Sequence, residues 1–321
     1  MRAAVLTAPF AFEIVDVPVP VPSADEVLVR VAACGVCASE LGAFTGMVPA
    51  SYPARLGHEV SGTVVDAGSD VRDLAPGDPV AVWVTGSGFA EYVAVRVEHC
   101  RPAGEVPLEL ALGEPLSCAV NAVELADVRL GDDVVLVGAG FMGNLVQQLV
   151  ALRGPRHVVV ADARPDALRQ AEQFGATRVV DVGRELLRDV VADLTDGRGA
   201  DVTFEATGNQ AALHTIGEVT RMSGKLVLVG YHQGVREIPL GHWNWMAYQI
   251  VNGHFREPAT ILHGMTVGMR LLRAGALSLD DLVTHRFALE DVGEAFRCAL
   301  EKPPGFVKAT VVVGEPVGTA S

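Results

Sequence analysis

The stretch Val135-Leu136-Val137-Gly138-Ala139-Gly140-Phe141-Met142-Gly143 decides the fold of this chain. An apolar strand runs into a Gly-x-Gly-x-x-Gly turn, and an apolar helical pattern follows at once. Gly138 permits a tight turn, Gly140 lets the backbone approach a pyrophosphate, and Gly143 lets the helix pack closely on the strand. Glycine-rich turns are common by themselves. This motif is specific because a strand precedes the turn and a helix follows it. Together they predict a dinucleotide-binding turn.

A carboxylate stands where such a site needs one. Asp162 ends the next apolar strand, 19 residues after Gly143. A carboxylate there accepts hydrogen bonds from the adenosine ribose and repels a 2′-phosphate, which predicts NAD in preference to NADP. Phe141 and Met142 would contribute backbone N–H groups from the helix N-terminus. Arg164 softens the preference, and a purely structural role for Asp162 as the cap of a strand or turn stays open.

Strands and helices alternate on both sides of this turn, a pattern typical of a parallel doubly wound sheet. The predicted strands are 133–138, 157–162, 178–181, 201–206, 225–230 and 248–251. The predicted helices are 141–153, 165–174, 185–194 and 209–222. The tail is expected to contain a helix over 259–274, a strand near 283–287, a helix from 289 and a last strand over 309–313.

The first third of the chain has a different texture. Residues 1–117 are rich in Val, Pro and Gly, and short apolar stretches alternate with turn signals such as Pro76-Gly77-Asp78. This pattern predicts an all-β, barrel-like domain, on which the tail folds back. We therefore expect two domains, 1–117 with 259–321 and 118–258, in an α/β protein.

Composition narrows the function. With 39 acidic against 25 basic residues the net charge is -14, which argues against nucleic-acid or anionic membrane partners. The N-terminus lacks the apolar core of a secretory signal, so a cytoplasmic location is expected. Five cysteines, an odd number, direct attention to metal or thiol chemistry rather than to a disulfide framework.

Three segments contain residue types that bind zinc: 34–40, 57–59 and 114–118. A catalytic zinc needs three protein ligands and one open position. Cys34 and Cys37 alone could equally be a redox pair or half of a structural zinc site. The scattered positions of the other cysteines make a four-cysteine structural site a poor fit.

The motifs, taken jointly, resemble those of the zinc-containing medium-chain dehydrogenases. The resemblance is carried by Gly57-His58-Glu59-x-x-Gly62-x-Val64-x-x-x-Gly68-x-x-Val71, Pro76-Gly77-Asp78-x-Val80, Cys34-Gly-x-Cys37-x-Ser39 and the Gly138–Gly143 turn. It extends over nearly the whole chain. It implies a GroES-like β-barrel catalytic domain and a Rossmann-type cofactor domain.

The resemblance also implies a ligand set. Cys37 and His58 match the family's zinc ligands, and Cys34 would be a packed neighbour. The third ligand falls 17 positions before Gly131, on Glu114. Cys118 is the alternative, of a suitable type but one helical turn out of register.

Three further residues receive roles from the resemblance. Glu59 would be a carboxylate behind the ligands or an exchanging ligand. Ser39 matches the hydroxyl that receives the substrate proton, although serine often serves only as a local cap. Lys308 either reaches the cofactor phosphates or is an exposed surface lysine.

The expected function is hydride transfer between NAD(H) and a secondary alcohol or polyol, or the corresponding ketone or aldehyde. One catalytic zinc per chain is expected, because the family's four-cysteine structural lobe is absent between Val80 and Tyr92. The alternatives are a zinc-independent quinone or enoyl reductase of the same fold and a non-catalytic dinucleotide-binding protein. The resemblance also implies a small-molecule alcohol or ketone substrate and a homodimer or homotetramer, with the edge strand near 248–251 as the pairing site.

Overall fold

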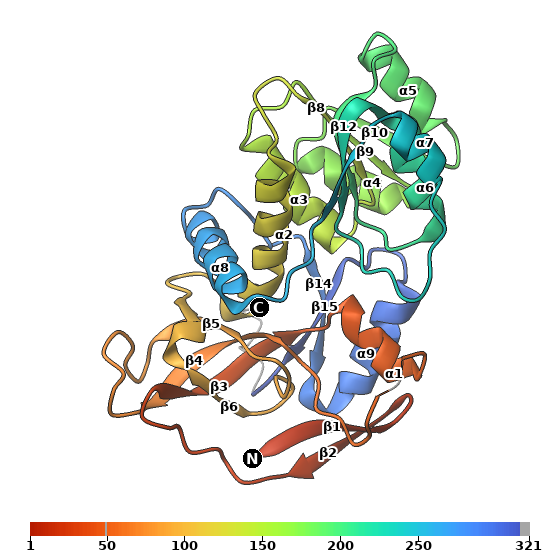
Figure 1. Cartoon of the computed structure of the whole chain (residues 1–321). Helices are drawn as coiled ribbons and strands as arrows, with labels where there is room; N and C mark the ends of the chain where they lie inside the picture. Colours follow the sequence, from red (N-terminus) through yellow and green to blue (C-terminus); the bar gives the residue numbers. More distant parts are fainter. Residues whose placement is uncertain (49, 315–321) are drawn as a thin grey trace, which may run out of the picture. The chain divides into compact units, whose positions relative to one another are not determined.

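The chain folds into two units, each built around its own sheet (Figure 1). Unit 1 comprises Met1–Ser117 and Met265–Ser321, and unit 2 comprises Cys118–Gly264. The computed structural model describes residues 1–48 and 50–314, so the last residues of the predicted first domain, 315–321, lie outside the described part. The division falls within helices α2 (Gly113–Ala126) and α8 (Pro258–Arg273).

Unit 2 contains a six-stranded sheet in the order β10-β9-β8-β11-β12-β13, with all neighbours parallel. Its strands are β8 (Asp133–Val137), β9 (His157–Asp162), β10 (Arg178–Asp181), β11 (Ala200–Glu205), β12 (Thr220–Leu228) and β13 (Gln249–Asn252). The strand order reverses between β8 and β11. The predicted doubly wound sheet is therefore confirmed, with a topological switch point at the carboxyl end of β8.

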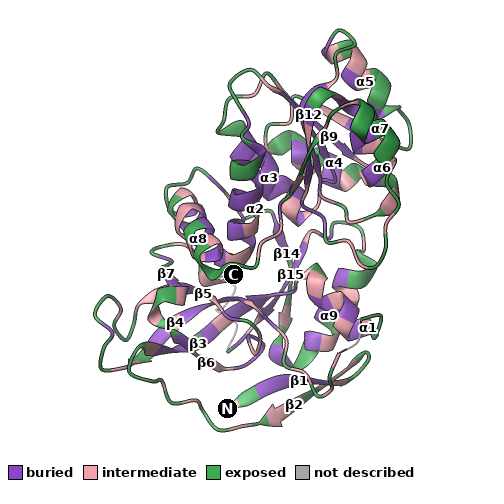
Figure 2. Cartoon of the chain, viewed as in Figure 1, coloured by how far each residue is buried: buried purple, intermediate pink, exposed green. Residues whose placement is uncertain are grey.

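Helices connect these strands, because a parallel pair needs a crossover. They are α3 (Phe141–Ala151), α4 (Pro165–Gln173), α5 (Leu187–Leu194), α6 (Gln210–Val219) and α7 (Leu240–Trp245). Alternate residues of β8 and β9 form one buried cluster with α5 and α6. The central strands β8 and β11 are buried along their whole length, and β9, purple in Figure 2, is buried except at its two end residues. Near-continuous burial explains why these strands are apolar runs in the sequence.

The predicted helix over 209–222 is too long. The helix ends at Val219, and Thr220 already begins β12. The hydroxyl of Tyr248 donates hydrogen bonds to the backbone oxygens of Gly217 and Thr220 at 2.6 and 3.0 Å. Thr220 is β-branched and favours a strand. A tyrosine almost thirty residues away thus satisfies carbonyls at the helix end, which no local pattern reveals.

Unit 1 contains a seven-stranded, mainly antiparallel sheet in the order β14-β15-β3-β4-β5-β7, with β6 also paired to β3. The strands are β3 (Glu26–Gly35), β4 (Glu59–Ala67), β5 (Pro79–Trp83), β6 (Tyr92–Arg96), β7 (Cys100–Pro102), β14 (Val283–Ala288) and β15 (Lys308–Val312). β15, near the end of the chain, pairs antiparallel with β3. The sequence did not predict the separate hairpin β1 (Arg2–Ala8) and β2 (Ala11–Asp16).

The core of unit 1 gathers aromatic rings from distant segments. Phe44, in the short helix α1 (Leu41–Thr45), lies 5.1 Å from Phe296 in α9 (Val292–Glu301), measured between ring centroids. Phe89 approaches Phe296 at 5.6 Å. These buried rings attach the returning tail to the barrel strands. Among the described residues, no helix combines the length and apolar character that crossing a membrane requires.

Candidate metal and dinucleotide sites

Unit 1 brings together a thiol, an imidazole and a carboxylate. One ligand atom each of Cys37, His58 and Glu59 lies within 4.8 Å of the others. The antiparallel pairing of β3 with β4 causes this, because Gly35 at the end of β3 is in register with Glu59 at the start of β4. The residues just beyond each strand end, Cys37 and His58, therefore meet. Sulfur, nitrogen and oxygen donors at this spacing fit a zinc ion.

A second carboxylate orients His58. Glu40, three residues after Cys37, is buried, and its Oε1 lies 3.1 Å from Nδ1 of His58 and accepts a 2.7 Å bond from the N–H of Gly57. Burial by itself would lower the pKa of His58, but hydrogen bonds and charge interactions with Cys37 and Glu40 raise it to about 12. A carboxylate on one ring nitrogen is the usual support of a metal-binding histidine. Glu40 is not among the residues predicted from the sequence, where its only signal is its place three positions after Cys37.

Glu59 forms a buried ion pair with Lys308. The ammonium nitrogen of Lys308 lies 2.8 and 2.6 Å from the two carboxylate oxygens of Glu59, and the two residues are 5% and 1% exposed. Burial alone would lower the pKa of Lys308, but the negative charges of Glu59 and Cys37 raise it. A Cβ atom at Gly35 would overlap a carboxylate oxygen of Glu59, so only glycine leaves room for this pair.

Lys308 therefore differs from one of its two expected roles, that of a surface lysine. It is not an exposed lysine, and its ammonium group is bound by Glu59 rather than directed to solvent. The resemblance had implied contact with cofactor phosphates. In the structure this lysine places a positive charge beside the candidate metal ligands, and its contact with the cofactor phosphates stays a prediction.

The third predicted ligand, Glu114, is not part of the Cys37–His58–Glu59 group among the described residues. Glu114 lies in the first turn of α2, and its charge contributes to the raised pKa of Lys308. The structure thus brings Glu59, rather than Glu114, to the thiol and imidazole. Glu59 follows His58 directly at the start of β4, and the register of β4 with β3 brings both residues to Cys37.

The remaining predicted residues of this unit also have definite places. Ser39 donates a hydrogen bond from its hydroxyl to Sγ of Cys37 at 3.2 Å. Cys34 is fully buried in the apolar core, and burial together with Glu40 and Glu59 raises its pKa well above the ordinary value. Cys34 is therefore a packed thiol, as the resemblance implied, and the redox-pair alternative has no support in this geometry.

Unit 2 places the glycine-rich turn at the switch point of the sheet. Gly138 has φ +108°, a conformation that favours glycine. A Cβ atom at Gly143 would overlap the carbonyl oxygen of Gly138, whereas one at Gly140 would meet nothing within 4 Å. The first internal bond of α3 runs from the N–H of Asn144 to the oxygen of Gly140 at 2.9 Å. An open surface above a helix N-terminus fits a pyrophosphate.

Asp162 supports this turn directly. One of its carboxylate oxygens accepts the N–H of Ala139, and the other accepts the N–H of Arg164, both at 2.8 Å. The side chain of Arg164 lies 3.8 Å from the same carboxylate. A carboxylate oxygen has two acceptor positions, so these bonds leave Asp162 able to accept ribose hydroxyls.

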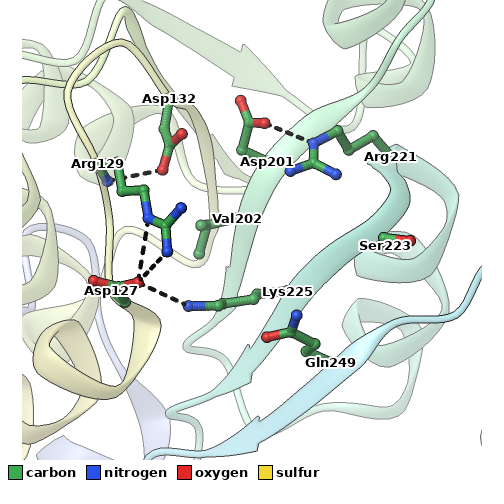
Figure 3. A pocket seen from close by; sticks show the side chains of 9 residues that line it. All are labelled: Asp127, Arg129, Asp132, Asp201, Val202, Arg221, Ser223, Lys225 and Gln249. Carbon is green, nitrogen blue, oxygen red and sulfur yellow. Dashed lines mark hydrogen bonds and ion pairs between the residues drawn. The ribbon is translucent and has the colours of Figure 1, made fainter.

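A separate cavity of about 150 Å³ is lined by the nine residues labelled in Figure 3. It lies at the amino ends of β11 and β12, whereas the glycine-rich turn follows the carboxyl end of β8. Its walls carry both signs of charge, and the charges pair with one another. Arg221 donates to Asp201 at 2.6 Å, and Arg129 donates to Asp127 at 2.9 Å. Such mutual pairing indicates a structural network rather than a ligand site.

Comparisons with known proteins agree with this chemistry. The profile of the family described as alcohol dehydrogenase GroES-like domain matches residues 23–105, and that of the family described as zinc-binding dehydrogenase matches residues 142–255. The chain is 31% identical to an L-threonine 3-dehydrogenase of Ruegeria pomeroyi, over 88% of this chain and 91% of that protein. It is 29% identical to a sorbitol dehydrogenase of Bacillus subtilis, over 94% of each.

The fold agrees as well. The crystal structure of galactitol-1-phosphate dehydrogenase from Escherichia coli superposes with a TM-score of 0.86 at 25% identity, covering 97% of this chain and 100% of that chain. Three observations therefore agree: the similarity over nearly the full length, the two family matches, and the thiol, imidazole and carboxylate of unit 1. The chain belongs to the zinc-dependent medium-chain dehydrogenase/reductase family, whose members are oxidoreductases.

Proposed function

We propose that this protein is a zinc-dependent dehydrogenase that transfers a hydride between NAD(H) and a secondary alcohol or polyol, or the corresponding ketone. The observation that carries the proposal is the grouping of Cys37, His58 and Glu59 within 4.8 Å, with the hydroxyl of Ser39 3.2 Å from the same sulfur. A quinone reductase without zinc has no need for this donor set. A non-catalytic protein has no need for the adjoining hydroxyl.

Each residue of the candidate metal site has a separate proposed role. Cys37 and His58 would hold the zinc ion, with Glu40 fixing the orientation of the imidazole. When bound, zinc supplies a Lewis acid that lowers the pKa of an alcohol, and NAD⁺ supplies the hydride acceptor. Ser39 would accept the alcohol proton and pass it outwards, because its hydroxyl adjoins the ligand sulfur and can both donate and accept.

The cofactor is proposed to be NAD, on the strength of Asp162. Its carboxylate lies against the glycine-rich turn, where it would meet the adenosine ribose and repel a 2′-phosphate. Phe141, Met142 and Gly143 would direct backbone N–H groups toward the pyrophosphate.

Zinc content and turnover test the proposal together. Protein purified without chelators should contain about one zinc per chain and reduce NAD⁺ with polyols such as sorbitol. Cys37→Ser and His58→Ala should lose both the zinc and the activity. Wild-type protein with full activity and less than about half an equivalent of zinc would contradict the proposal.

The third zinc ligand has three candidates, the carboxylates of Glu59 and Glu114 and the thiol of Cys118. Glu114 follows from the family position, and Glu59 from the geometry, although Glu59 is already paired with Lys308. The zinc content of Glu59→Ala, Glu114→Ala and Cys118→Ala decides among them. Loss of zinc in Cys118→Ala alone would exclude both carboxylates.

We also propose that the protein is a homodimer, or a homotetramer built from such dimers. In the part of the chain that the structure describes, β13 is an edge strand of the unit 2 sheet. Ile250 of β13 is 47% exposed, and Trp245, at the end of the preceding helix α7, is 79% exposed. An exposed apolar edge strand is a template for pairing with a second copy. Trp243, by contrast, is buried in the unit's own core.

A further inference from the structure

A second charged cluster occupies the carboxyl edge of the unit 2 sheet. Glu205, the last residue of β11, is completely buried. Its Oε2 lies 2.7 Å from Nε2 of His232, in the segment after β12. On the far side of the ring, Nε of Arg236 donates to Nδ1 of His232 at 3.4 Å. The three side chains thus form a chain running outwards from the sheet.

The other carboxylate oxygen of Glu205 holds the turn that follows β11. Oε1 accepts the N–H of Thr207 at 2.7 Å, the hydroxyl of Thr207 at 2.5 Å and the N–H of Gly208 at 3.0 Å. Arg236 also contacts this turn, because its Nη2 donates a hydrogen bond to the backbone oxygen of Gly208 at 3.3 Å. Glu205 therefore ties together two segments, 206–208 and 230–236.

The first of these segments touches the glycine-rich turn. A Cβ atom at Gly138 would lie 2.8 Å from Cγ2 of Thr207 and 3.0 Å from the carbonyl carbon of Ala206. The N–H of Ala206 also donates to the oxygen of Val137 at 2.8 Å. A shift of the 206–208 turn would therefore displace the turn that receives the pyrophosphate.

The hydrogen bonds select one tautomer of His232. Arg236 is only a donor, so the Nδ1 that it contacts must be an acceptor. The proton must then lie on Nε2, where it is donated to Glu205. A glutamine can reproduce this pattern with an amide N–H toward Glu205 and an amide oxygen toward Arg236. An alanine cannot, and it would leave a buried carboxylate oxygen without its partner.

The strand order places this cluster relative to a bound dinucleotide. In a doubly wound sheet the dinucleotide lies across the switch point, here between β8 and β11. Asp162 on β9 is on the adenosine side, so the nicotinamide half extends toward β11 and β12. The cluster is on that side. None of its residues belongs to the turn or to the ribose carboxylate already described.

We propose that His232 is a positioning residue, which fixes the segment 230–236 against the 206–208 turn and thereby shapes the surface under the nicotinamide half of the cofactor. The inference rests on the proposed function, because it needs a dinucleotide at this edge. It predicts that loss of His232 weakens binding of the whole dinucleotide but not of its adenosine half.

The experiment compares two ligands on the full-length protein. NADH contains the nicotinamide ring, and ADP-ribose lacks it. Dissociation constants are measured by NADH fluorescence and by calorimetry for wild type, His232→Ala and His232→Gln. The matched control is His214→Ala, which removes an exposed histidine of α6. If the wild type prefers NADPH, then NADPH and 2′-phospho-ADP-ribose replace the pair.

His232→Ala should raise the Kd for NADH about tenfold, the loss expected for one hydrogen bond to a buried charge. Its Kd for ADP-ribose should stay within about twofold, and His232→Gln should recover most of the NADH affinity. Arg236→Met removes the outer part of the cluster and should show the same bias, even if His232→Ala fails to fold.

Three results would overturn the inference: an unchanged Kd for NADH, equal weakening of both ligands, or a glutamine variant no better than alanine. Failure of the proposed function looks different, because the wild type itself would then bind neither NADH nor NADPH.

Discussion

Gly140 and Gly143 occupy one turn but differ in what a methyl group would meet. A Cβ at Gly143 would overlap the backbone oxygen of Gly138, and one at Gly140 would enter open space. To make room for a methyl group at Gly143, helix α3 would have to move away from the end of β8. Packing therefore requires glycine at Gly143, whereas at Gly140 we propose that glycine leaves room for the pyrophosphate.

We predict opposite effects of the two alanine variants. Gly143→Ala should lower the free energy of unfolding by about 1–3 kcal/mol, the usual cost of overpacking. Gly140→Ala should leave unfolding unchanged within about 0.5 kcal/mol and raise the Kd for NADH. Urea unfolding and NADH titration separate the two cases. A stable Gly143→Ala protein with normal NADH affinity would contradict the close packing of helix and strand.

At the scale of secondary-structure elements, the amino ends of β8 and β11 are held by buried carboxylates. Asp133 accepts bonds from Arg156 at 2.5 Å, His157 at 2.9 Å and Arg198 at 2.6 Å. Its N–H donates to Asp201 at 2.8 Å. Burial alone would raise the pKa of Asp133, but the bonds from Arg156, His157 and Arg198 outweigh burial and lower it. The same balance, led by Arg198, lowers the pKa of Asp201.

These lowered pKa values predict acid destabilisation of unit 2. A carboxyl whose pKa is lower when folded binds more protons in the unfolded state, so stability rises with pH. The contribution of Asp133 is present above its unfolded pKa of 3.8 and is lost as pH falls through the folded value. Asp133→Asn should cost about 2 kcal/mol at neutral pH and progressively less in acid.

Urea unfolding between pH 7 and pH 2 tests this expectation. The matched control is Asp193→Asn, which changes an exposed carboxylate of α5. It should follow the wild-type profile. A difference between Asp133→Asn and wild type that does not shrink in acid would contradict the charge-based explanation.

At the scale of the whole molecule, two features have opposite effects on dimer formation: the exposed edge of unit 2 favours it, and the net charge of -14 opposes it. Pairing through β13 buries apolar side chains, whereas two acidic chains repel. We predict a dimer whose dissociation constant falls as salt screens the repulsion. Ile250→Lys should shift the protein to monomer in sedimentation velocity.

The control for this shift is Leu186→Lys. Leu186 is also exposed, but it follows β10 at the other edge of the sheet, so its variant should remain dimeric. A wild-type monomer at all salt concentrations, or equal dissociation in both variants, would contradict pairing through β13.

The parallel sheet and the glycine-rich turn could be predicted from the sequence because both rest on local physics. A strand buried on both faces must be an apolar run, and at Gly138 and Gly143 of the turn any residue other than glycine would clash with neighbouring atoms. The alternation of strands and helices predicted a parallel doubly wound sheet, whereas the order of its strands came from the structure. The zinc chemistry followed from residue types and from resemblance.

What only the tertiary structure decided are the partners that meet across long stretches of chain. Lys308 pairs with Glu59 although 249 positions separate them, and no periodicity announces such a contact. The approach of Glu59 rather than Glu114 to Cys37 and His58 depends on the register of β3 with β4. A buried charge must find an opposite charge or a hydrogen-bond donor, and the folded chain determines which one is near.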